Sequence, residues 1–68
     1  MNRKALEKNL SALGYTLKRA HHPDAPWMVV SNVMTYHWDF KNLDGVRRFL
    51  VDERALYRYA RQHASLRA

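Results

Sequence analysis

The basic side chains toward the end of this chain are the residues whose type and spacing could do chemistry. Twelve Lys and Arg side chains stand against six Asp and Glu side chains in 68 residues, a formal net charge of +6. Residues 41–68 hold seven of these bases and three of the acids, and seven less three leaves +4 in that region. Such a surface attracts polyanions or acidic protein surfaces through a field that dissolved salt weakens.

Three arginines in this region have helical spacing. Arg54, Arg58 and Arg61 fall at i, i+4 and i+7, so on a helix they would share one side, opposite the apolar residues. A guanidinium grips phosphate oxygens with a planar fork of donors, so this spacing predicts phosphate binding. The alternative interpretation is a solvated helix face. Five further bases complete the predicted surface for nucleic acid or an acidic partner: Arg47, Arg48, Arg67, Lys18 and Arg19.

Three aromatic side chains could add contacts to a partner. Trp27 follows Pro26 at a strand entrance, where we expect it to stay partly exposed as an anchor for protein recognition. Tyr57 and Tyr59 lie among the arginines and could stack on bases, although Tyr57 fits better in the core with its hydroxyl in water. His63 is predicted at the boundary of that core.

The histidines form no recognisable catalytic or metal-binding pattern. His21, His22, Asp24 and His37 are conceivable ligands, but adjacent histidines at a strand end point apart and the spacing matches no HExxH or zinc-finger pattern. His37 beside Asp39 could imitate an acid–base pair, yet no candidate nucleophile or glycine-rich phosphate loop is near. We therefore expect no metal, no cofactor and no catalysis.

The first element that must position these residues is an amphipathic helix over residues 3–13. Leucines recur at i, i+4 and i+7 from Leu6 onward, and polar side chains fall opposite them. Asn2 can cap its start, and Gly14 can adopt the left-handed conformation that ends it.

Three strands follow in the predicted order. A period of two indicates a strand over residues 15–20, and the prolines of residues 21–26 make a loop. Further strands fit residues 27–31 and 35–41, with a glycine-free turn between them. Three aromatic residues of the last strand are expected on one face, covering the leucines of the first helix: Tyr36, Trp38 and Phe40.

A C-terminal helical region begins after Asn42, which can cap it. If it continued unbroken, Glu53 would lie in the middle of the apolar face, and an unpaired carboxylate is costly to bury. We favour a break in which Asp52 caps a second helix. The alternative is one long helix that extends past the edge of the core, so that Glu53 is exposed to water. In that case Arg47 lies on the same side of the helix as the other arginines.

Length and composition favour a single domain over residues 1–68. The hydrophobic share of 47% suits a folded chain, and the absence of cysteine removes disulfides as a supplement to a small core. No run approaches the roughly 20 apolar residues that a membrane span needs, and no secretory signal opens the chain, so we expect a cytoplasmic protein with no membrane contact. The predicted class is α+β: an N-terminal helix, a three-stranded antiparallel sheet, and one or two C-terminal helices.

The order of elements invites comparison with the double-stranded-RNA-binding domain. The run from Pro23 to Val29 looks like that family's loop into its second strand. That family places a lysine-rich cluster at the start of its last helix, whereas this chain has Asn42-Leu43-Asp44-Gly45 there. The comparison therefore brings no functional residue to this chain.

The chain also resembles small uncharacterised proteins of phages and other mobile elements. The resemblance lies in the helix ending Leu13-Gly14-Tyr15, the hairpin, and Phe40 with Leu43-Asp44-Gly45-Val46 leading to Phe49-Leu50. It implies an accessory or host-manipulating role, in the cytoplasm of a bacterial host.

Three hypotheses follow for a protein without catalytic activity. The leading one is binding to the phosphate backbone of DNA or RNA through the arginine-rich helix. The second is a phage-type accessory protein that docks the same basic surface on a host protein or defence complex and inhibits it by occlusion. The third is a homodimerising structural module, built on an unbroken C-terminal helix that self-associates through four residues: Leu56, Tyr57, Ala60 and Ala64.

Overall fold

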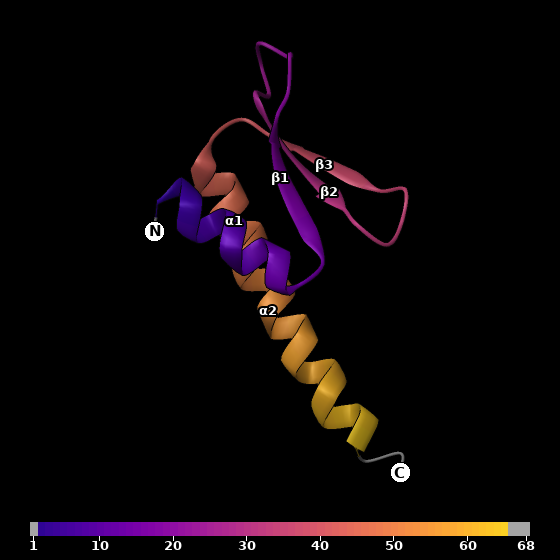
Figure 1. The fold of residues 1–68 in the computed structure, drawn as a ribbon. Helices are drawn as coiled ribbons and strands as arrows, with labels where there is room; N and C mark the ends of the chain where they lie inside the picture. The colour runs from indigo at the N-terminus through magenta and orange to yellow at the C-terminus, as the bar shows by residue number, and fades with distance from the viewer. Residues whose placement is uncertain (1, 66–68) are drawn as a thin grey trace.

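The computed structural model describes residues 2–65 and contains two helices and three strands (Figure 1). In chain order these are α1 (Arg3–Ala12), β1 (Tyr15–Arg19), β2 (Trp27–Ser31), β3 (His37–Phe40) and α2 (Leu43–Ser65). The strands form one antiparallel sheet in the order β1-β2-β3. The predicted α+β class is confirmed, with one C-terminal helix rather than two.

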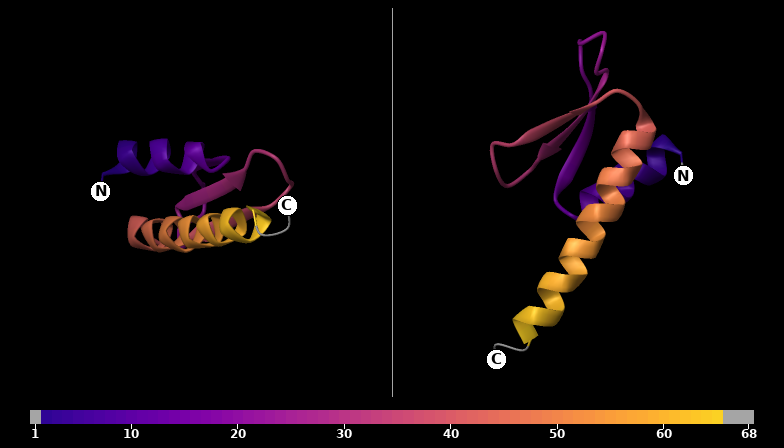
Figure 2. Two further views of the ribbon diagram at one scale, coloured as in Figure 1. Left: turned by 90° about the horizontal axis from the view of Figure 1, so that it is seen from below. Right: turned by 180° about the vertical axis from the view of Figure 1, so that it is seen from behind.

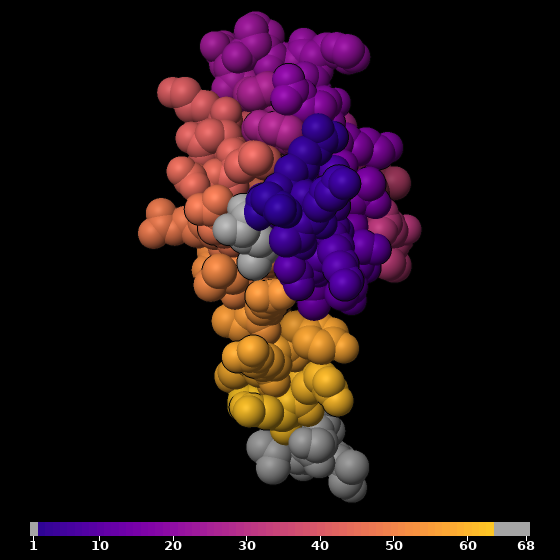
Figure 3. Space-filling model, turned by 60° about the vertical axis from the view of Figure 1, so that its left-hand side comes forward, coloured from indigo at the N-terminus to yellow at the C-terminus, as the bar shows by residue number. Residues whose placement is uncertain are grey.

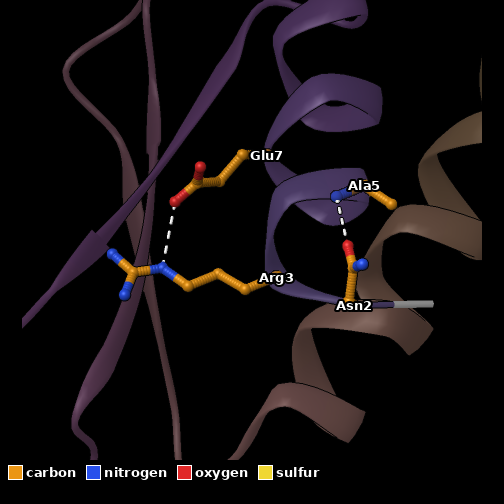
Figure 4. Close-up of polar contacts among 4 residues, drawn as sticks. All are labelled: Asn2, Arg3, Ala5 and Glu7. Carbon is orange, nitrogen blue, oxygen red and sulfur yellow. Dashed lines mark hydrogen bonds and ion pairs between the residues drawn. The ribbon is translucent and has the colours of Figure 1, made fainter.

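Helix α1 begins and ends where its sequence signals indicate. The Ala5 amide donates a hydrogen bond of 2.9 Å to Asn2 Oδ1, which caps the helix, and Arg3 Nε donates to Glu7 Oε1 at 3.0 Å one turn further on (Figure 4). After the helix, Gly14 has a φ of 88°, a conformation that glycine adopts without steric cost. The chain therefore reverses at Gly14 and enters β1.

Both helices cover the same face of the sheet, where they lie side by side (Figure 2). Strand register places Leu17 of β1 opposite Val29 of β2, and Val29 opposite Trp38 of β3, on the covered face. The buried core consists of Leu6, Leu10, Leu17, Val29, Val46 and Leu50. By the alternation of strands, the side chains on the uncovered face are Thr16, Lys18, Met28, Val30, His37 and Asp39.

Strand β3 is shorter than the predicted range of residues 35–41. Ser31 Oγ accepts hydrogen bonds from the amides of Val33 at 3.3 Å and Met34 at 3.0 Å. These bonds hold the chain in a turn without glycine, so β3 starts at His37. One further backbone bond, from the Ser31 amide to the Tyr36 carbonyl oxygen at 3.0 Å, closes the connection.

The aromatic residues do not cover the leucines of α1, so that prediction is wrong. Trp38 and Phe40 pack against Phe49 of α2 instead, with ring centroids 5.1 Å and 5.6 Å from its own, and Tyr15 of β1 joins them at 5.2 Å. Tyr36 is exposed and lies beside Trp38. The reason is strand order, because α2 packs over β2 and β3 whereas α1 packs over β1 at the other edge. A Cβ at Gly45 would come within 3.0 Å of the Phe40 ring, so the glycine permits this close approach.

Helix α2 continues without interruption through Asp52, so the favoured break is also wrong. The Tyr15 hydroxyl donates a hydrogen bond of 3.0 Å to Glu53 Oε2, and Glu53 is half-buried at the edge of the core. A carboxylate that has a donor and keeps contact with water does not force the helix to end. Burial raises the pKa of Tyr15, and the hydrogen bond to Glu53 and the negative charge of that carboxylate raise it further.

Candidate nucleic-acid interface

The distal part of α2 extends beyond the sheet and beyond α1 (Figures 1 and 3). Every residue in the range 55–63 is exposed, and we call this range the projecting segment. The cause is a difference in length: α2 has 23 residues, whereas α1 has 10 and each strand has at most five. The last turns of α2 therefore have neither sheet nor helix beside them in the part of the chain that is described.

The unbroken course of α2 brings four arginines together. At 3.6 residues per turn, Arg47, Arg54, Arg58 and Arg61 fall within about 60° of one another around the helix axis. From the first to the last of them the helix rises about 21 Å. We call these four residues the arginine row. Arg47 joins the other three only because there is no break at Asp52.

Arg54 anchors the row beside α1. Its Nη2 donates a hydrogen bond to Asn9 Oδ1, and the Arg54 side chain is half-buried. The row therefore flanks the packed side of α2, and the prediction that these arginines lie opposite the apolar residues is wrong for Arg54. The physical reason is that α1 occupies that flank of α2, a packing that the periodicity of one helix does not reveal.

The other members of the row face water. Arg47 forms an ion pair of 2.9 Å with Asp44, but both side chains are exposed, so the pair is screened and weak. The Arg61 guanidinium lies 5.9 Å from the centroid of the Tyr57 ring. Arg58 is exposed, and the sequence has no Asp or Glu anywhere after Glu53. The distal end of the row thus carries positive charge that no neighbouring carboxylate on the helix offsets.

The remaining predicted bases do not join the row. Arg48 points to another side of α2, where it lines a groove with Asp52 and residues of β3. Lys18 lies on the uncovered face of the sheet, and the Arg19 guanidinium lies 4.7 Å from the centroid of the Trp27 ring. Arg67 lies outside the described residues.

Trp27 is partly buried against the core, and cations flank it. The Arg3 guanidinium lies 5.2 Å from its ring centroid, in addition to Arg19. Cation–π contacts of this kind are worth about 0.5–1 kcal/mol at exposed sites. The indole is therefore already engaged within the domain, which makes it a poorer anchor for a partner than its sequence position suggested.

The two tyrosines of the projecting segment are exposed. Tyr57 is 53% exposed and Tyr59 is 60% exposed, so the expectation that Tyr57 packs into the core is wrong. His63, predicted at the core boundary, is also exposed, and its ring stacks on Tyr59 with 3.7 Å between centroids. The core ends near Leu50, which the helical pattern alone does not indicate. The side chain of Ala64 lies outside the described part of the chain.

Sequence reasoning missed one exposed apolar surface. Val33, Met34 and Tyr36 in the connection between β2 and β3 are all exposed. Leu56 of α2, which the dimer hypothesis already names, is also exposed, beside a separate groove that Tyr15 and other residues line. The apolar run Val33-Met34 in a turn with no glycine was the one available signal for such a surface.

The histidine region contains no ligand cluster. Within residues 2–65, no three or more His, Cys, Asp or Glu side chains come together in a way that could hold a metal ion. His22 Nδ1 accepts a hydrogen bond of 3.3 Å from the Asp24 amide, and His37 Nε2 lies 4.0 Å from Asp39 Oδ2. Neither helix, over its described residues, is both long enough and apolar enough to cross a membrane.

No protein-family model, curated protein or solved structure matches this chain. The proposal for function therefore depends on the arginine row of α2.

Proposed function

We propose that this chain binds nucleic acid through the phosphate backbone, without catalysis, and that the arginine row supplies the contacts. The observation that supports this proposal is the continuity of α2, which aligns four guanidinium groups on one side of a single rigid element. The row borders α1 at Asn9, where the neighbouring Lys8 is also exposed and can extend the positive surface.

The dimensions of the row suit a nucleic-acid backbone. One strand of duplex DNA carries a phosphate about every 3.4 Å along the helix axis, so a row about 21 Å long spans several phosphates even when it lies at an angle to that axis. The exposed guanidiniums of the row can offer forks of donors to these oxygens, and Arg54 adds its positive charge beside them. Contacts of this kind position a protein on the backbone and carry no direct sequence readout. The proposed binding is therefore insensitive to sequence and strongly sensitive to salt.

The salt dependence of binding tests this proposal. Four phosphate contacts on duplex DNA predict a slope of about −3.6 when the logarithm of the association constant is plotted against the logarithm of salt concentration. Fluorescence anisotropy with two labelled duplexes of unrelated sequence, titrated over a series of salt concentrations, measures this slope. We expect the same slope and similar affinities for both duplexes. An absence of binding to any nucleic acid at low salt would remove the proposal.

A second candidate function is self-association, which the exposed apolar residues of α2 favour. Leu50 and Glu53 lie on the side of α2 that faces the core, and Tyr57 and Ala60 continue that side into the projecting segment. Leu56 is exposed next to them. A second copy of the chain could cover this side of the helix, as the dimer hypothesis requires.

Sedimentation equilibrium of the purified chain without nucleic acid tests self-association. If the second candidate is correct, the chain has the mass of a dimer, and the double variant Leu56→Ser with Tyr57→Ser shifts it to the mass of a monomer. Tyr59→Ser is the matched control, because Tyr59 is equally exposed but lies away from Tyr57 and Ala60 around the helix. A monomer at every concentration would exclude this function.

A further inference from the structure

The projecting segment is a bare helix. Each of its nine residues is exposed, and the views in Figures 1 and 2 show this end of α2 extending away from the sheet and α1. An α-helix with its side chains is about 10–12 Å across. The described part of the chain therefore presents a narrow rod that a partner can approach from any side.

The segment carries its positive charge on one side, at Arg58 and Arg61, and no negative charge on any side. All six acidic residues of the chain lie at or before Glu53, and none follows. A helix whose exposed surface contacts only water can carry charges of both signs, as α1 does with Glu7 and its lysines. A helix that enters a groove between two phosphate backbones meets negative charge on both walls, so a carboxylate directed toward either wall would be repelled.

Contacts within the segment stabilise the helix where it extends beyond the sheet and α1. Tyr59 and His63, one turn apart, stack with 3.7 Å between ring centroids, and His63 Nδ1 lies 2.9 Å from the Tyr59 carbonyl oxygen. Arg61 lies over Tyr57 on another side. Pairs at i, i+4 stabilise exposed helices, and the docked half of α2 provides the nucleus from which the helix extends. The rod is thus formed before a partner arrives.

We propose that the projecting segment enters the major groove of B-form DNA, with the arginine row along the phosphates of one groove wall. This inference rests on the proposed function and names its substrate class. The major groove of B-form DNA is about 12 Å wide and admits an α-helix, whereas the major groove of A-form RNA is too deep and narrow for side chains to read. The protein therefore distinguishes duplex DNA from duplex RNA by groove shape, although both carry the same backbone charge.

A comparison of the affinities for three forms of nucleic acid is the first test. Fluorescence anisotropy compares a 20-base-pair duplex DNA with a duplex RNA of the same sequence and with the single-stranded DNA, all at one salt concentration. We expect the DNA duplex to bind about tenfold more tightly than either alternative, because only its groove can take the helix. Equal affinity for the two duplexes would overturn groove insertion but leave phosphate binding intact. Binding to neither would overturn both proposals.

A new carboxylate on the far side of the segment is the second test. Ala60 lies about 130° around the helix from the centre of the arginine row, so Ala60→Glu would meet phosphates only if the helix is inserted between two backbones. We expect Ala60→Glu to weaken binding to duplex DNA about tenfold at moderate salt. Thr35→Glu, on the exposed connection between β2 and β3, makes the same change in net charge and should weaken it less than about twofold.

Two readouts separate the explanations for these variants. Glutamate is a good helix former, so circular dichroism should show unchanged helix content in Ala60→Glu. Equal effects of the two substitutions would show that net charge alone matters and would overturn insertion. In that case the dependence of the association constant on salt concentration, measured for the unsubstituted protein, would still test phosphate binding. Groove insertion and phosphate binding therefore remain distinguishable.

Discussion

The double substitution Arg58→Glu with Arg61→Glu is expected to lower the affinity for nucleic acid about 100-fold or more at moderate salt. A hydrogen bond to a charged group contributes about 1.5–3 kcal/mol, and the loss of two such contacts amounts to about two orders of magnitude in affinity. Both side chains are exposed on the projecting segment, so their replacement leaves the core intact. Arg54 is excluded from the variant because it also holds α2 to Asn9.

A matched pair elsewhere on the surface separates position from net charge. Lys18→Glu with Lys41→Glu changes the net charge by the same amount, on exposed residues outside the arginine row. At physiological ionic strength charges interact over only about 8 Å, so we expect this pair to weaken binding less than tenfold. Fluorescence anisotropy across a salt series should also show the slope of the row variant reduced by roughly two. If both pairs weaken binding equally, the row has no special role.

Leu50→Ala is expected to destabilise the fold by about 2–5 kcal/mol, the range for a leucine removed from a packed core. Leu50 is 1% exposed and is one of six buried core residues in the part of the chain that the structure describes. A chain of this length has a total stability of about 3–10 kcal/mol, so this one change removes much of it. Urea denaturation followed by tryptophan fluorescence, with Trp27 and Trp38 as reporters, measures the loss.

The neighbouring residue provides the control for that substitution. Val51 is also apolar and also in α2, but it is 58% exposed, so Val51→Ala should change the free energy of unfolding by less than about 1 kcal/mol. A similar loss for both substitutions would mean that the outer side of α2 is covered in solution, which would contradict the exposure described here.

Local patterns in the sequence were sufficient to identify most of the elements. The leucine repeat with Asn2 before it and Gly14 after it placed α1 to within a residue, the period of two placed β1, and the apolar residues after the proline loop placed β2. These signals are readable because each depends on residues that are neighbours along the chain. Ser31, which accepts the hydrogen bonds of the turn before β3, also contacts residues close to it in the chain, but no standard turn pattern in the sequence predicted this turn.

Long-range contacts decided the rest, and above all the course of α2. Whether Glu53 could lie within one continuous helix depended on Tyr15, which is 38 residues away and supplies the hydrogen bond. The exposure of Tyr57 and His63 likewise depended on where the short sheet and α1 come to an end.

The arginine row shows the same division between sequence and tertiary structure. The sequence alone determined that Arg54, Arg58 and Arg61 share one side of a helix, because the helical period is a property of the backbone. Only the tertiary structure decided which side that is, because the packing of α1 brings Asn9 to Arg54 and leaves the later arginines beyond the core. Periodicity orders residues around a single axis, whereas burial depends on the neighbours that the folded chain brings to that axis.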